Sequence, residues 1–392
     1  DINWGLESKA NDQVEFSAGW GQTGIIGKLS LKFTNFSFAN LFRKNDNFRG
    51  FLPQGDGQTL TISGQTNGQY YQSYSISFLD PWFGGKRPNS LSVSAFYSVQ
   101  TDVSSQYYNS AYMNNYYNYL SGYGNYYGGY YDNYESYYDP DKSIKMFGLS
   151  LGWGKRLRWP DDYFTLMAEL SYQRFMLKDW SYLYIMLNNG QYMNTGNCNS
   201  LSLNLTLSRN STDNPIFPRY GSEFSASLQI TPPYSLFSKK DYSTYGKNNY
   251  DEAASMYKWI EYHKWKFKAK TYTALMDIQK CPVIMTRTEF GILGHFNKYK
   301  RSPFETFYVG GDGMTGYSYN ASETIALRGY ENGSLTPYGS EGYAYIRLGA
   351  ELRYPLMLEN STSIYALGFV EAGNAWNDVS NFNPFQLKRS AG

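Results

Sequence analysis

The chain consists mainly of long segments in which apolar and polar residues alternate one by one. In residues 28–34 (KLSLKFT) every second position is apolar, and residues 201–207 (LSLNLTL) and 223–230 (EFSASLQI) repeat the pattern. Successive side chains of a β-strand point to opposite faces, so each segment has one apolar and one polar face. Many segments run for about ten residues, which matches the ~9–11 of a membrane-spanning strand rather than the ~5–6 of a soluble one. The pattern therefore predicts an all-β fold. It favours a transmembrane antiparallel up-and-down barrel over a β-sandwich, which would turn the apolar face into its core.

Thirteen complete strands are expected, followed by the start of a fourteenth near residue 386. The connections fall mostly into a long polar class and a short class that is usually marked by proline. Outer-membrane barrels have long external loops and short periplasmic turns, so we expect the long connections outside the cell. Two connections depart from this rule: 21–24 is short on the long side, and 39–56 is long on the short side. The expected strands are 13–20, 25–38, 57–68, 70–80, 89–101, 143–156, 162–178, 198–212, 220–231, 261–280, 282–297, 341–355 and 361–376, and the long connections are 102–142, 179–197, 232–260 and 298–340.

Composition excludes several classes of protein. Mean hydropathy is −0.55, and no window approaches the ~20 apolar residues of a transmembrane helix. The 35 Lys+Arg against 33 Asp+Glu leave a net charge of +2, whereas nucleic-acid binding usually needs a strong basic excess. Cys198, Cys281, His263 and His295 lack the spacing of a zinc site, and none suggests a paired nucleophile and base. We therefore expect no enzyme activity, no catalytic residue, no metal and no cofactor.

Two of the long connections have local features of their own. The Tyr/Asn-rich loop 102–142 holds fourteen tyrosines between residues 107 and 138. It is interpreted either as an adaptable external loop that packs on its neighbours or as a surface that grips a partner by stacking. Residues 251–264 have apolar side chains at helical spacing and are expected to form a short helix.

The stretch 304–376 carries the most specific signals. In the strand that follows residue 341, Arg347, Glu351 and Arg353 share one face, while the other face is apolar enough for lipid. The charged face is therefore expected to line the lumen. In the next strand Val370 and Ala372 take one face, which places Glu371 on the other. Two adjacent strands would thus present acids inside a confined barrel.

An acid in a partly dry lumen needs a partner, and a guanidinium is the best one. Arg328 lies in the connection 298–340 beside Gly329, which permits a tight turn. One hypothesis is that this connection folds into the lumen and that Arg328 bridges Glu351 and Glu371. The alternative is that Arg328 is solvated and that the acids pair with Arg347 and Arg353.

The chain resembles the BamA family of central outer-membrane β-barrel assembly factors, and in particular homologues from the Bacteroidota. The loop motif Leu327-Arg328-Gly329-Tyr330 is similar to that family's Val-Arg-Gly-Phe/Tyr. Residues 350–355 (AELRYP) and 371–376 (EAGNAW) resemble its following strands, and 78–83 (FLDPWF) and 217–222 (FPRYGS) its turns. The resemblance implies that Glu351 and Glu371 are the acidic partners of Arg328. It covers essentially the whole chain, although residues 312–324 are inserted where the family runs almost directly on.

The resemblance further implies a sixteen-stranded barrel of the bacterial outer membrane. Residues 1–392 would be an incomplete barrel domain, with periplasmic POTRA domains before Asp1 and about two and a half strands beyond Gly392. The implied function is the folding and insertion of β-barrel proteins by strand templating at a lateral seam. The implied partners are unfolded outer-membrane clients, accessory periplasmic or surface lipoproteins and outer-membrane lipid. The seam strand would carry Val14, Phe16, Ala18 and Trp20. The alternatives are a two-partner-secretion or TamA-type barrel, or a passive porin or adhesin.

Overall fold

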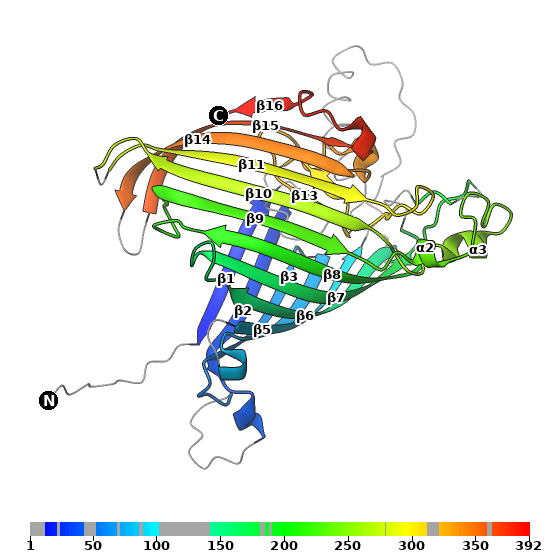
Figure 1. The fold of residues 1–392 in the computed structure, drawn as a ribbon, viewed down its shortest axis with the longest axis horizontal. Helices are drawn as coiled ribbons and strands as arrows, with labels where there is room; N and C mark the ends of the chain where they lie inside the picture. The colour runs from blue at the N-terminus through cyan, green and yellow to red at the C-terminus, as the bar shows by residue number, and fades with distance from the viewer. Residues whose placement is uncertain are drawn as a thin grey trace, which may run out of the picture.

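The chain forms one long antiparallel sheet that curls into a barrel-like wall (Figure 1). The structure is a computed structural model that describes residues 12–21, 24–42, 52–68, 71–85, 89–101, 142–180, 185–187, 190–278, 280–311, 321–358 and 363–392. Within these ranges each strand pairs with its neighbours in chain order, except that β11 pairs with β14. The wall strands are β1 (Gln13–Gly21), β2 (Gly24–Phe36), β3 (Gln58–Thr66), β4 (Tyr71–Asp80), β5 (Asn89–Thr101), β6 (Ser143–Arg156), β7 (Phe164–Lys178), β8 (Gly196–Asn210), β9 (Tyr220–Ile230), β10 (His263–Ala274), β11 (Val283–Gly294), β14 (Ala344–Leu358), β15 (Ser363–Trp376) and β16 (Lys388–Ala391). The all-β fold class is therefore confirmed, and the expected strands at 89–101 and 143–156 are confirmed at both ends.

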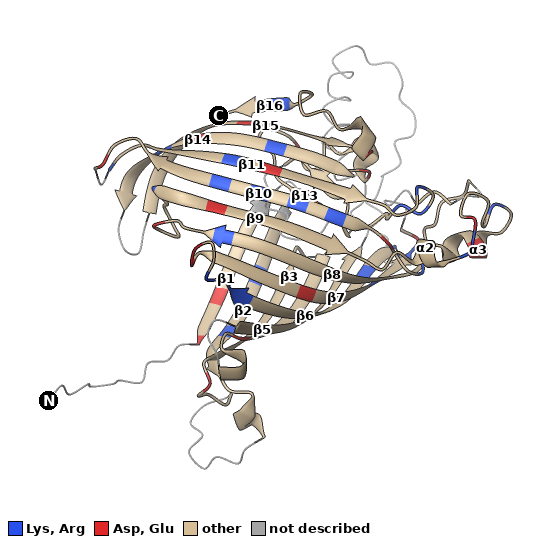
Figure 2. Ribbon diagram, viewed as in Figure 1, with Lys and Arg blue, Asp and Glu red and all other residues tan. Residues whose placement is uncertain are grey.

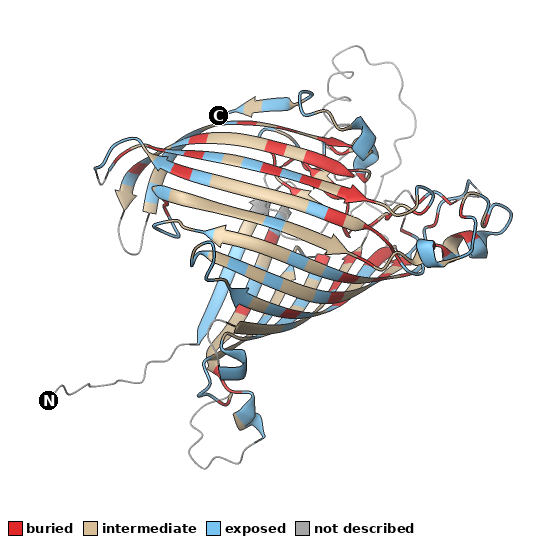
Figure 3. Ribbon diagram, in the orientation of Figure 1, coloured by how far each residue is buried: buried red, intermediate tan, exposed pale blue. Residues whose placement is uncertain are grey.

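The two faces of the wall differ as the alternation predicts. On β6, Leu149 and Leu151 are about half exposed, whereas Ser150 between them bonds across to Ser94 of β5 with 2.7 Å between the hydroxyl oxygens. Exposed apolar side chains recur along most strands. Figure 3 shows buried and exposed positions interspersed along the strands, with the buried ones most frequent toward the end of the wall nearest α2. Among the described residues the only other sheet is a short pair inside the wall, so no second sheet covers the apolar face. The sandwich alternative is therefore wrong.

Several element boundaries differ from the sequence-based expectation. The strand expected at 341–355 continues through Pro355 to Leu358. Beyond Arg353 this strand pairs with β15 and no longer with β11, so the missing N–H of Pro355 costs no ladder bond on that side. A shift of register between Pro355 and Met357 accommodates the ring. The strands expected at 261–280 and 282–297 are also shorter at both ends, and residues 275–282 between them form the connection at Cys281.

The helical content is small. The helix expected at 251–264 is only α3 (Tyr250–Ser255), which begins where the Asn249 side chain accepts hydrogen bonds from the first-turn N–H groups. A second short helix, α2 (Tyr234–Phe237), was not expected. Among the described residues no helix is long and apolar enough to cross a membrane. The Tyr/Asn-rich loop 102–142 lies outside the described residues except for Lys142.

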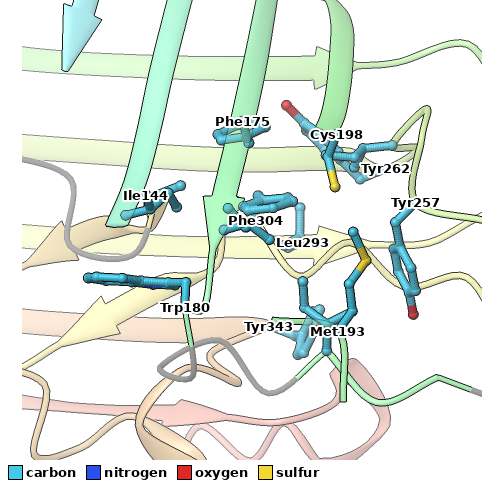
Figure 4. Packing of buried hydrophobic residues seen from close by; sticks show 14 of the residues in the cluster. Ile144, Phe175, Trp180, Met193, Cys198, Tyr257, Tyr262, Leu293, Phe304 and Tyr343 are labelled. Carbon is cyan, nitrogen blue, oxygen red and sulfur yellow. The ribbon is translucent and has the colours of Figure 1, made fainter. Parts of the chain in front are cut away.

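One end of the wall encloses an apolar core (Figure 4). Trp180, Met193 and Tyr257 from the long connections pack there with Phe175 of β7. The ring of Phe304, from the connection between β11 and β14, stacks on Phe175 with centroids 4.1 Å apart. Side chains from several long connections therefore fill this end of the interior.

Candidate functional site: the ion-paired loop

We call the connection between β11 and β14 the inner loop (residues 295–343). Its described residues 295–311 and 321–343 contribute side chains that pack with buried residues of the wall strands. Its described part contains β12 (Phe307–Val309) and β13 (Glu323–Ile325), which form a short parallel pair. Phe307, Ile325 and Leu327 are buried, so apolar contacts also hold the loop in place. The loop therefore behaves as a packed part of the barrel interior.

Arg328 of the inner loop contacts acids on two neighbouring strands. Its Nη2 donates to Glu351 Oε1 of β14 at 2.5 Å and to Glu371 Oε1 of β15 at 2.7 Å. Its Nε donates to the same Glu371 oxygen at 3.0 Å, and its backbone N–H donates to Glu371 Oε2 at 3.1 Å. The guanidinium carbon also lies 3.8 Å from the centroid of the Phe369 ring, a contact that favours a cation. The structure thus brings together the three residues that the sequence singled out.

The same two acids also pair with arginines of the wall. Arg353 Nη2 lies 2.6 Å from Glu351 Oε2, and Arg347 Nη2 lies 2.9 Å from Glu371 Oε1. The structure therefore contains both the Arg328 bridge of the first hypothesis and the pairing with Arg347 and Arg353 of the alternative. This is possible because a carboxylate has about four acceptor positions, so one acid can satisfy several guanidinium donors. Figure 2 shows that acidic and basic positions recur on the strands of this side of the wall.

Burial makes the two acids dependent on their cationic partners. Glu351 and Glu371 are only 4% and 3% exposed, and an acid in such a place is stable only when it is paired. Burial lowers the pKa of the Arg328 guanidinium, but the hydrogen bonds and charge of Glu371 and Glu351 offset this and raise the pKa above its usual value. Arg328 is therefore a permanent cation whose position is fixed from two strands at once.

The neighbours of Arg328 explain the local sequence. Gly329 has a φ of +86°, and a Cβ there would lie 3.0 Å from the Cβ of Ser390, so the turn favours glycine. The Tyr330 hydroxyl donates to the Arg389 carbonyl at 2.8 Å. Leu327 is fully buried. The motif therefore inserts an apolar anchor, a cation and a tight turn in three successive residues, and it holds the loop to β14, β15 and β16.

Sequence reasoning missed several members of the cluster. Phe369 is two residues before Glu371 and therefore shares its face, which the alternation could have indicated. Arg287 of β11 lies 3.7 Å from Glu371 Oε1. No local pattern predicts that contact, because it depends on the register between β11 and β14.

The residues proposed for a seam lie on β1, at the edge of the sheet. Val14 and Phe16 are 72% and 75% exposed, and Ala18 is exposed too. Trp20 pairs with Ile25 of β2, but its side chain lies outside the described residues. In the described sheet β1 pairs with β2 alone. Among the described residues, the other edge of β1 has no strand beside it.

Amphipathic strands around an ion-paired inner loop define a transmembrane β-barrel whose interior is occupied by its own loop. Residues 53–392 match the model of the Omp85 superfamily domain, so the chain belongs to this superfamily. It is an outer-membrane β-barrel protein.

Solved structures show the same fold. The crystal structure of BamA from Haemophilus ducreyi lacking POTRA domains 1–3 is similar with a TM-score of 0.62 and 17% identity, over 98% of this chain and 64% of that one. CdiB from Escherichia coli is similar with a TM-score of 0.54 and 10% identity, over 97% of this chain and 59% of that one. The chain thus spans less than two thirds of either protein. No curated protein sequence matches it.

Proposed function

We propose that this barrel folds and inserts β-barrel proteins into the bacterial outer membrane, as a BamA-type assembly factor of Bacteroidota origin. It would act on unfolded outer-membrane clients with the help of accessory lipoproteins, and it would make or break no covalent bond. The motifs of residues 327–330 and 371–376 support this assignment within the superfamily. The barrel fold that the chain shares with BamA, at 17% identity, is consistent with this assignment.

The observation that carries the proposal is the bridge from Arg328 to Glu351 and Glu371. A passive porin needs an open lumen. Its function does not require an arginine that is held inside the lumen by two buried acids. An assembly barrel needs a rigid interior beside a wall that can open, because the rest of the structure must survive while one seam rearranges. A buried, charge-assisted bridge across β14 and β15 provides that rigidity on one side of the barrel.

The edge strand β1 gives the proposal a physical mechanism. Unpaired backbone groups are costly in lipid, so a client strand must gain hydrogen bonds as it enters the membrane. An edge that offers free N–H and C=O groups supplies them by β-augmentation. The exposed Val14 and Phe16 would then continue an apolar surface from β1 onto the incoming strand.

The test is reconstitution of the full-length protein into liposomes with an unfolded outer-membrane barrel as client. The wild type is expected to accelerate client insertion over empty liposomes. Arg328→Ala is expected to lose most of the acceleration, because it removes every side-chain donor of the bridge. Arg328→Lys keeps the charge but lacks the planar fork of donors, so it is expected to retain only part of the activity.

The outcomes separate the remaining alternatives. No acceleration by the wild type removes the assembly function. Unchanged kinetics in Arg328→Ala remove the role of the arginine. Solute conductance without client folding would indicate a passive porin or adhesin, and export of a co-expressed passenger would indicate a two-partner-secretion or TamA-type barrel.

A further inference from the structure

A second charged anchor holds the inner loop, and it is built on β10. Lys264, Lys266, Lys268 and Lys270 occupy alternate positions of this strand and form what we call the lysine ladder. Their alternation places all four on one face, while Trp265 on the other face is 50% exposed. Basic residues recur along β10 in Figure 2.

The buried end of the ladder contacts two acids of the inner loop. Lys264 Nζ lies 3.1 Å from Glu305 Oε2 and 2.9 Å from Glu323 Oε2, and its side chain is only 1% exposed. It also lies 4.8 Å from the centroid of the Phe307 ring. A lysine so deeply buried is stable only when it is fully paired. The loop acids and Lys264 therefore depend on each other for their position.

Glu323 is shared between three rungs of the ladder. Lys266 Nζ lies 3.0 Å from Glu323 Oε2, and Lys268 Nζ lies 3.4 Å from Glu323 Oε1. Burial raises the pKa of the Glu323 carboxyl, but the charges of Lys264, Lys266 and Lys268 outweigh it and hold the pKa well below its usual range. Glu323 thus remains an anion throughout the neutral range. Lys270, the last rung, pairs instead with Glu223 of the wall at 3.5 Å.

The two anchors have opposite polarity. At β14 and β15 the loop supplies the cation and the wall supplies the acids. At β10 the loop supplies the acids and the wall supplies the cations. A loop that turned over would bring Arg328 toward the lysines of β10 and would separate Glu323 from them, and both changes are unfavourable. The charge pattern therefore favours the observed orientation of the loop.

We propose that Glu323 and Lys264 are positioning residues that lock the inner loop to β10 and so keep the barrel interior closed. The inference needs only the position of the loop, and it does not depend on the proposed insertion activity. Glu305 adds a second acid to the same lock.

The test is single-channel recording of the full-length protein in planar lipid bilayers, which needs no client. Glu323→Gln keeps the size of the side chain and removes its charge. Its open probability is expected to rise by on the order of tenfold, because Lys264 loses its closest partner while the Arg328 anchor still restrains the loop. The matched control is Glu223→Gln, the same change on a wall acid that pairs with the ladder but not with the inner loop. It is expected to leave the openings unchanged.

A second pair of variants keeps the proposal testable if Glu323→Gln does not fold. Lys266→Gln leaves Lys264 in place and is expected to raise the open probability in the same direction by a smaller factor. Lys266→Arg keeps the charge and is expected to restore closure, which a purely steric role would not predict. The proposal is overturned if the glutamine variants at 323 and 266 gate like the wild type, or if Glu223→Gln opens the barrel equally.

Discussion

Glu371 is the most connected acid of the site. It accepts hydrogen bonds from the backbone and side chain of Arg328 and from Arg347, and Arg287 lies 3.7 Å away. Its carboxylate therefore compensates several buried guanidinium groups at once. Removing one partner of such a cluster leaves buried charge without compensation, which costs more than the pair contributes when it is intact.

Glu371→Gln is therefore expected to lower the free energy of unfolding of the barrel by ~3–5 kcal/mol. The measurement is urea unfolding in detergent or lipid, followed by tryptophan fluorescence. The matched control is Glu169→Gln on β7, because Glu169 is a wall acid without an ion-pair partner among the described residues. Equal effects of the two substitutions would contradict the role given to Glu371.

At the scale of elements, β1 differs from the strands that follow it. It has nine residues, it pairs with β2 alone in the described sheet, and its apolar side chains are largely exposed. Gly19 lies within it and pairs with Ile26. A glycine inside a strand weakens it through chain entropy and the lack of a side chain to pack. Gly19 is thus a position at which β1 gains little from packing.

Gly19→Val is expected to strengthen the pairing of β1 with β2 by roughly 0.5–1 kcal/mol. If β1 must separate to template a client, insertion in the liposome assay should slow by about two- to fivefold, since ~1.4 kcal/mol corresponds to a factor of ten. Ala18→Val is the control, because it adds a β-branched side chain beside Gly19 without removing a glycine. Faster insertion by Gly19→Val would argue against opening at this strand.

At the scale of the whole molecule, the barrel separates an apolar exterior from an ionic interior. The outer face meets acyl chains, so its leucines need no protein partner. The inner face holds the lysine ladder and the acids of β14 and β15, which pair with the inner loop. The inner loop is thus attached to the wall at two places, by Arg328 at β14 and β15 and by Glu323 at β10.

This separation predicts that the same substitution at two adjacent positions of β8 lowers the free energy of unfolding by different amounts. Leu205→Arg places a cation on the lipid-facing side and is expected to destabilise the barrel by about 2–4 kcal/mol if it lies near the bilayer centre. Thr206→Arg points to the opposite face and should cost much less. Reversible unfolding in lipid vesicles measures both values, and similar costs would place Leu205 away from lipid.

The periodic pattern was sufficient to locate the strands and their two faces. Alternation is a local signal repeated over ten or more residues, so errors at strand ends do not disturb it. It also placed Glu351 and Glu371 on the inner face. It failed at Pro355, where the strand continues, and at α3, which is shorter than the helical spacing indicated. The end of β14 and the length of α3 both depend on which other segments of the chain pair or pack with them, and the local pattern does not contain that information.

The sequence by itself therefore determined the class of fold, because the side-chain alternation of a strand is a property of the strand alone. Only the tertiary structure decided the pairing of charges. Lys264 and Glu323 are 59 residues apart in the chain, and the acids of β14 and β15 had two possible sets of arginines. Coulomb attraction acts through space, so the choice of partner depends on how the inner loop returns through the barrel rather than on spacing along the chain.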